Sequence, residues 1–454
     1  MIDKIESLAV LNLSKKNAFI FVLILTAVFV LDATIVKFSS YSGLKIPIWL
    51  HLAIFLIFSI IFLTFTPILL NYVRKLSSGD SYPIKHLRTR YFYIIICGTL
   101  ILTAAITLII IFQMLFVNKY SLILLEIQTY FSYLSALVFL SYLIYLFISW
   151  LTKKINYIII LFVIAFSLAS VNLIISLIYI QSYFSFYVFP DVKPYPITSY
   201  VVNIPGSPIT ESLSMLYDIL SLSSFLVMWI STAILLGHYR YKIGRIKFFV
   251  LLAIPLIYYI FPFQNYFVDQ IFTWLFYSPV IFSAIYILIF SATKEVGAFF
   301  FGLSFWSASS LTRHPQVHKS LLISFIGMVI LFCSIEISPL RSHVYPPYGF
   351  ITEAFLPIGA YLLLIGIFTS SQYISQDTRL RKEFYKSAEP HINLLKSIGV
   401  SEMEKQFGGK IKSLQESSTS LKIIEPKLEE ARVREILREV LNELYQSKTR
   451  KEKT

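Results

Sequence analysis

Long apolar runs without lysine or arginine constrain this chain more than any other feature. Ten of them lie before residue 370: Ala18–Val36, Ile48–Val73, Tyr91–Val117, Ile127–Leu151, Tyr157–Ile180, Leu213–Leu236, Phe248–Phe261, Ile271–Ser291, Leu321–Ile337 and Gly349–Thr369. A helix needs about 20 residues to cross a hydrocarbon core. Only 14% of the chain is charged, against about 25% in soluble domains. We therefore expect an all-α, polytopic transmembrane helical bundle of about ten spans. Whether the short run Phe248–Phe261 spans fully stays open.

Lysine and arginine are sorted between alternate loops. With the amino terminus inside, the inner segments before the tail hold 17 of these residues, the outer segments hold 5, and the tail from Ser371 holds 17. The positive-inside rule then predicts a multi-pass protein of the cell (plasma) membrane with both termini cytoplasmic. Ala18–Val36 is longer than the apolar region of a signal peptide, so we expect a retained first span.

Composition changes near residue 370, which predicts a transmembrane domain (1–370) and a cytoplasmic stalk with a helical, coiled-coil-like tail (371–454). No Gly or Pro occurs between Ile367 and Glu389, so we expect one continuous helix, Gly349–Glu389, that Pro390 ends. Four basic residues of this stalk are expected to contact anionic lipid head groups: Arg379, Arg381, Lys382 and Lys386.

An apolar stripe at helical spacing near the end of the chain predicts pairing with a partner helix or with a second copy of the chain. Its residues are Val433, Ile436, Leu437, Val440, Leu441 and Leu444. Two loops are long enough to cover the membrane surface. Gln181–Thr210 is rich in proline and aromatic residues and is expected to form an outer lid. Ala292–Ser320 is expected on the inner side, with VGAFFFGLSFW as an interfacial or half-inserted helix.

Carboxylates gather on the outer side of this topology. They are Asp32, Glu126, Asp191, Glu211, Asp218, Asp269, Glu336 and Glu353. Asp218, Glu336 and Glu353 adjoin apolar sequence at membrane depth, where ionisable residues usually serve a function. With His51 and His343 they form a candidate outer polar site for a cation, a proton or a small polar ligand. The alternative is that these acids are simply solvated at the interface.

Sequence support for enzyme chemistry is missing. There is no HExxH, no GxSxG and no kinase signature, and FGGKIKS lacks the spacing of a phosphate loop. Cys97 and Cys333 form neither a disulfide framework nor a zinc motif. We therefore predict no catalytic residue, no cofactor and no bound metal. The net charge of +14 is spread over loops and tail, which argues against nucleic-acid binding.

The stretch YPPYGF, followed by a span and then by ISQDTRLRKEF, resembles uncharacterised integral membrane proteins of ammonia-oxidising archaea. The resemblance covers the last span and the stalk. It implies an archaeal membrane protein and carries no activity to any residue here.

These features favour a non-enzymatic sensor or scaffold that couples the outer acidic face to the cytoplasmic tail. The first alternative is a cation- or proton-coupled secondary transporter, which should show a broken helix and a polar cavity at mid-depth. The second alternative is a membrane enzyme acting on lipids, whose mark would be converging His, Asp and Glu side chains at one interface.

Overall fold

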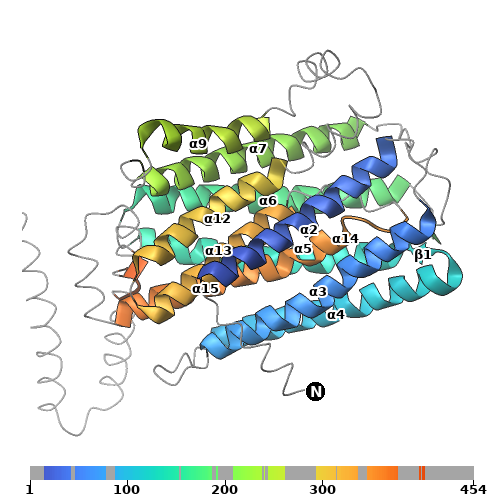
Figure 1. Cartoon of the computed structure of the whole chain (residues 1–454), viewed down its shortest axis with the longest axis horizontal. Coiled ribbons are helices and arrows are strands. Elements are labelled where there is room, and N and C mark those ends of the chain that lie inside the picture. The colour runs from blue at the N-terminus through green and yellow to red at the C-terminus, as the bar shows by residue number, and fades with distance from the viewer. Residues whose placement is uncertain are drawn as a thin grey trace, which may run out of the picture. The chain divides into compact units, whose positions relative to one another are not determined.

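A computed structural model gives the fold. It describes residues 15–41, 47–77, 87–152, 155–186, 191–192, 208–237, 240, 244–260, 293–312, 314–335, 345–376, 398–399 and 401–403. The long helices are α2 (Lys15–Tyr41), α3 (Ile48–Ser77), α4 (Leu87–Val117), α5 (Leu122–Leu151), α6 (Tyr157–Phe186), α7 (Pro208–Leu236), α9 (Arg245–Ile260), α12 (Thr293–Leu311), α13 (Pro315–Ile335) and α15 (Leu356–Gln376), with the short α14 (Phe350–Ala354) before α15. Figure 1 shows the long helices lying side by side as a bundle. The expected all-α bundle is confirmed.

In the described part of the chain, seven helical segments are long and apolar enough to cross a membrane: α3, α4, α5, α6, α7, α13, and α14 with α15 taken together. Large apolar side chains are exposed along them, for example Ile101 (70% exposed) and Phe116 (72%) on α4. Such surface is unfavourable in water and favourable against lipid. The protein is therefore a polytopic membrane protein. α2 contains the first predicted span, and the 16 residues of α9 cover the short predicted seventh span up to Ile260.

Helices α13 and α15 form the centre of the bundle, and their backbones touch through glycine. A Cβ atom on Gly327 of α13 would lie 2.4 Å from the backbone nitrogen of Leu363. A Cβ atom on Gly359 of α15 would lie 2.7 Å from the backbone nitrogen of Leu331. Small residues let membrane helices approach this closely. The pair thus forms a stiff central unit, and α15 is buried along its length up to Ser375.

The continuous helix expected from Gly349 is interrupted at its start. α14 ends at Ala354, Phe355 forms a turn, and α15 begins at Leu356. The backbone N–H of Phe355 donates to the carbonyl of Thr352 (3.2 Å), a tight contact of three residues. Pro357 has no N–H to donate to the carbonyl of Glu353, which explains why the regular helix begins anew here. The continuation from residue 377 to 389 lies outside the described residues.

Helix α12 corrects the assignment of Ala292–Ser320 to an inner surface loop. Only three residues separate it from α13, and the two helices pack along each other (Figure 1). Gly302 faces Val329 of α13, and Glu295 interacts electrostatically with Cys333 near the far end of α13. α12 therefore runs the length of α13 inside the bundle. The surface position was predicted because the neighbouring run Ile271–Ser291, which is outside the described residues, had already been assigned as a span.

Two ends of the bundle matter below. The α14 end holds α14 and the two-residue strands β1 (Tyr120–Ser121) and β2 (Asp191–Val192), which pair antiparallel. The Trp150 end holds the carboxyl ends of α5 and α15. By contacts the chain divides into a unit 1–402 and a unit 403–454, and the first includes residues 371–376 of α15. The two ends of the predicted outer lid, residues 181–186 and 208–210, belong to α6 and α7. The rest of the lid apart from β2 lies outside the described residues, as do the basic stalk cluster and the apolar stripe Val433–Leu444.

Candidate functional site

The short helix α14 is held at its start by a carboxylate from α2. Gly349 has a φ of 86°, a left-handed conformation that favours glycine. Its backbone N–H donates to Asp32 (3.0 Å), and the Thr352 hydroxyl donates to the other oxygen of Asp32 (2.6 Å). Asp32 is only 1% exposed. Because the first N–H groups of a helix have no partner within it, Asp32 both anchors and caps α14.

A tyrosine and a histidine join α14 to α3. The Tyr348 hydroxyl donates to the backbone carbonyl of His51 (3.0 Å) and lies 2.9 Å from His51 Nδ1. Both contacts are satisfied when Nδ1 carries the proton and donates to the tyrosine oxygen. Burial raises the pKa of the Tyr348 hydroxyl, and the nearby Asp32 carboxylate raises it further. Tyr348 therefore stays protonated and keeps its role as a donor.

The second carboxylate, Glu353, is fully buried and faces α5. Thr129 donates to its Oε2 (3.1 Å), whereas Oε1 accepts no hydrogen bond within the described part of the chain. The Tyr133 hydroxyl is also buried without a hydrogen bond there, and it interacts electrostatically with Glu353. Two oxygen atoms are thus available for a further donor or a cation beside Glu353.

The two carboxylates are near enough to interact with each other electrostatically. In the described residues, the hydrogen bonds to Asp32 and Glu353 all come from neutral groups, and no lysine or arginine pairs with either. Buried charges are normally paired. We call the group Asp32, His51, Tyr348, Thr352, Glu353, Thr129 and Tyr133 the α14 polar centre.

Aromatic rings close the centre on one side. Phe355, at the turn between α14 and α15, packs edge-on against Phe29 of α2 (5.3 Å) and Phe62 of α3 (5.1 Å). The Tyr345 hydroxyl donates to the backbone carbonyl of Met114 on α4 (3.2 Å). These contacts place apolar rings near the centre, and a low local dielectric strengthens electrostatic interactions.

The predicted site residues separate into three groups. Glu353 and His51 lie in the α14 polar centre. Asp218 is exposed on α7 and is not part of it. Glu336 and His343 lie outside the described residues, as do the predicted head-group contacts. Sequence reasoning counted Asp32 among the outer acids but did not select it, although a carboxylate inside the first span is itself a signal. Thr129, Thr352 and Tyr348 carried no signal that would distinguish them from other polar residues.

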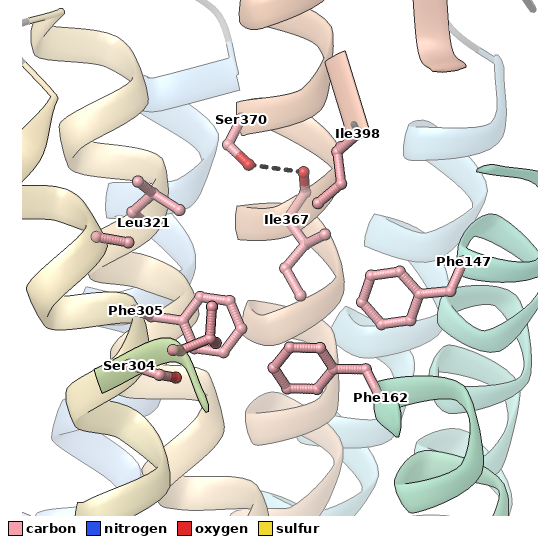
Figure 2. A pocket seen from close by; sticks show the side chains of 10 residues that line it. Phe147, Phe162, Ser304, Phe305, Leu321, Ile367, Ser370 and Ile398 are labelled. Carbon is pink, nitrogen blue, oxygen red and sulfur yellow. Dashed lines mark hydrogen bonds between the residues drawn. The ribbon is translucent and has the colours of Figure 1, made fainter. Parts of the chain in front are cut away.

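A cavity of about 20 Å³ lies toward the Trp150 end. Figure 2 shows Phe147, Phe162, Phe305 and Ile367 around it, with Ile398 at its side. The two serines in its wall, Ser304 and Ser370, each donate to a backbone carbonyl of their own helix. The cavity is therefore dry and apolar, unlike the polar cavity expected of a transporter. Within the described residues, no three His, Cys, Asp or Glu side chains are grouped as a metal site would require.

The fold and the centre define the class: a polytopic α-helical membrane protein with a buried pair of carboxylates. Comparison of the chain with family models, with curated proteins and with solved structures gives no match.

Proposed function

We propose that the protein is a non-enzymatic membrane sensor or scaffold that couples the α14 polar centre to the Trp150 end. The observation that supports this most is the position of Glu353. It is buried one turn before α15, with Oε1 accepting no hydrogen bond in the described part of the chain. A proton or a small cation would complete its coordination and relieve the repulsion from Asp32.

α15 offers the physical connection. About 24 Å of helix, at 1.5 Å per residue, separates Leu356, the first residue of α15, from Gln372. The glycine contacts with α13 prevent α15 from bending independently. At the Trp150 end the Gln372 amide donates to Glu402 (2.8 Å), and the Trp150 indole donates to the same carboxylate (3.0 Å). A shift of α14 on ligand binding would thus reach the first residues of the tail.

A cation- or proton-coupled secondary transporter is the second candidate. The interruption at Phe355 beside a buried carboxylate supports it, since transporters commonly bind substrates and ions at broken helices. The apolar character of the described cavity favours the sensor.

For the topology we propose the ten crossings expected from the sequence: the seven segments above, α2, α9, and the run Ile271–Ser291, which lies outside the described residues. An even number places both termini on one side, and the distribution of lysine and arginine makes that side the cytoplasm of a cell (plasma) membrane. Archaeal origin, lipid contact by the stalk cluster, and pairing through the stripe Val433–Leu444 remain proposals that rest on the sequence.

The experiment that tests this function uses the full chain in proteoliposomes, with Trp150 kept as its only tryptophan. Protons, Na⁺ and Ca²⁺ are added singly to the α14 side, and both ion uptake and Trp150 emission are recorded. The sensor predicts a saturable change of emission without uptake. Saturable uptake would favour the transporter, and the absence of both responses to all three ions would contradict the proposal.

A further inference from the structure

A short segment of the tail packs against the Trp150 end, far in sequence from the helices that it touches. Ile398, Ser401 and Glu402 are 4%, 1% and 4% exposed. Ser401 donates to the backbone carbonyl of Trp150 (3.2 Å), 251 residues away. This burial is not what a solvated stalk would show, and it means that these three residues pack against the bundle.

The Glu402 carboxylate is recognised by one donor from each of two helices. Trp150 Nε1 of α5 donates to Oε2 (3.0 Å), and Gln372 Nε2 of α15 donates to Oε1 (2.8 Å). Each carboxylate oxygen therefore has a donor. Hydrogen bonds to charged acceptors are stronger than those between neutral groups. A leucine or a glutamine at this position would leave at least one of the two buried donors poorly satisfied.

Shape adds to this recognition at two places. A Cβ atom on Gly399 would lie 2.2 Å from Cγ2 and 3.1 Å from Cβ of Ile374 on α15, so only glycine fits without displacement. The preceding residue, Ile398, supplies one wall of the apolar cavity beside Phe147 and Ile367 (Figure 2). The segment thus matches the bundle at four residues. Ile398 lines the cavity and Gly399 fits against Ile374. Ser401 donates to the Trp150 carbonyl, and Glu402 accepts from two side chains.

We propose that the carboxyl ends of α5 and α15 form a peptide-docking site, and that its occupant is a segment of the same chain, Ile398, Gly399, Ser401 and Glu402, acting as a latch. Docking places Ile398 in the wall of the apolar cavity. Because the segment is tethered to α15, its effective concentration at the site is high, on the order of millimolar. This inference is independent of whether the α14 polar centre binds a cation.

Disulfide trapping in the full-length protein tests the latch. Cys97→Ser and Cys333→Ala remove the native thiols, and Ile374→Cys with Gly399→Cys then places two thiols on the contact. The Cβ separation of 3.1 Å is a few tenths of an ångström below the usual disulfide range, and Ile374→Cys removes the clashing methyl group. The protein is oxidised mildly in nanodiscs, denatured and treated with PEG-maleimide, which labels free thiols. We expect most molecules to remain monomeric and unlabelled, because their two thiols have formed a disulfide within the chain. The control pair, Ile123→Cys with Gly399→Cys, places one thiol at the opposite end of α5 from Trp150 and should close at least ten-fold more slowly.

Variants of the recognition residues separate docking from chance proximity. Trp150→Phe and Glu402→Gln should each slow closure of the 374/399 pair by about ten-fold, the effect of a hydrogen bond to a charged group. Trp229→Phe is the matched control, because Trp229 also donates from its indole, but to the carbonyl of Leu252. It should leave closure unchanged. Equal closure of the test and control pairs would overturn the proposal. So would disulfide-linked dimers, since a second copy would then occupy the site.

Discussion

Asp32 and Thr352 are 320 positions apart in the sequence, and a 2.6 Å hydrogen bond joins them inside the bundle. This contact, with that of Gly349, ties α2 to the short helix α14 that precedes α15. The same helical turn carries Glu353. The conformation of α14 therefore depends on a carboxylate from the other end of the chain, and any ligand of Glu353 binds next to that anchor.

Asp32→Asn is expected to destabilise the protein by about 1–3 kcal/mol. An amide can accept from only one of the two donors and leaves the other buried and poorly satisfied. Denaturant titration in micelles measures the free energy of unfolding. Asp218→Asn is the control, because Asp218 is exposed on α7, and surface changes usually stay within about 0.5 kcal/mol. Equal effects of the two substitutions would refute the anchoring role.

Gly327→Ala and Gly359→Ala should each lower the free energy of unfolding by about 1–3 kcal/mol, because the new methyl group meets backbone atoms of the facing helix. Gly98→Ala in α4 has nothing within 4 Å of its new Cβ. It should be neutral or stabilising by up to about 1 kcal/mol, since alanine favours helix over glycine. Thermal unfolding of the three variants distinguishes them, and similar losses in all three would contradict the close approach of α13 and α15.

Tyr348→Phe is expected to reduce the loss of stability at alkaline pH. The pKa of Tyr348 in the folded protein is raised above its ordinary value of 10.0. Above about pH 10 the unfolded tyrosine releases its proton while the folded one keeps it. Stability therefore falls as pH rises. Thermal midpoints between pH 8 and 11 should fall less steeply in Tyr348→Phe than in the parent protein.

Tyr157 is exposed, so Tyr157→Phe serves as the control. Its thermal midpoint should fall with pH as steeply as that of the parent protein. If the thermal midpoint of Tyr348→Phe fell with pH as steeply as that of the parent protein, the inference that Tyr348 is buried and protonated would be wrong.

Much of the fold could be predicted from the sequence, because apolar length and the absence of lysine and arginine are local properties. They located α2 to α7, α13 and α15. The interruption at Phe355 was missed, although Pro357 is visible in the sequence, because proline is tolerated inside membrane helices and its effect depends on the packing around it. A helix at VGAFFFGLSFW was expected, but its packing along α13 was not, because the neighbouring apolar run Ile271–Ser291 was assigned the crossing.

The candidate site could be predicted only in part. Glu353 and His51 stand out as ionisable residues beside apolar runs. Their partners Thr129 and Tyr348 are ordinary polar residues whose importance comes from contacts over 224 and 297 positions. The same holds for Glu402, which lies among many charged tail residues and is selected only by the donors Trp150 and Gln372. Pairings of this kind follow from the three-dimensional fold and leave no pattern in one sequence.

The central claim is that occupation of the α14 polar centre changes the contacts at the Trp150 end. The most direct test compares Trp150 emission of the parent protein and of Glu353→Gln during titration with protons, Na⁺ and Ca²⁺. Gln keeps the size of the side chain and can still accept from Thr129, but it lacks the charge that would bind a cation. The account predicts a saturable shift in the parent protein for at least one of these ions and none in Glu353→Gln. The same shift in both proteins would contradict it.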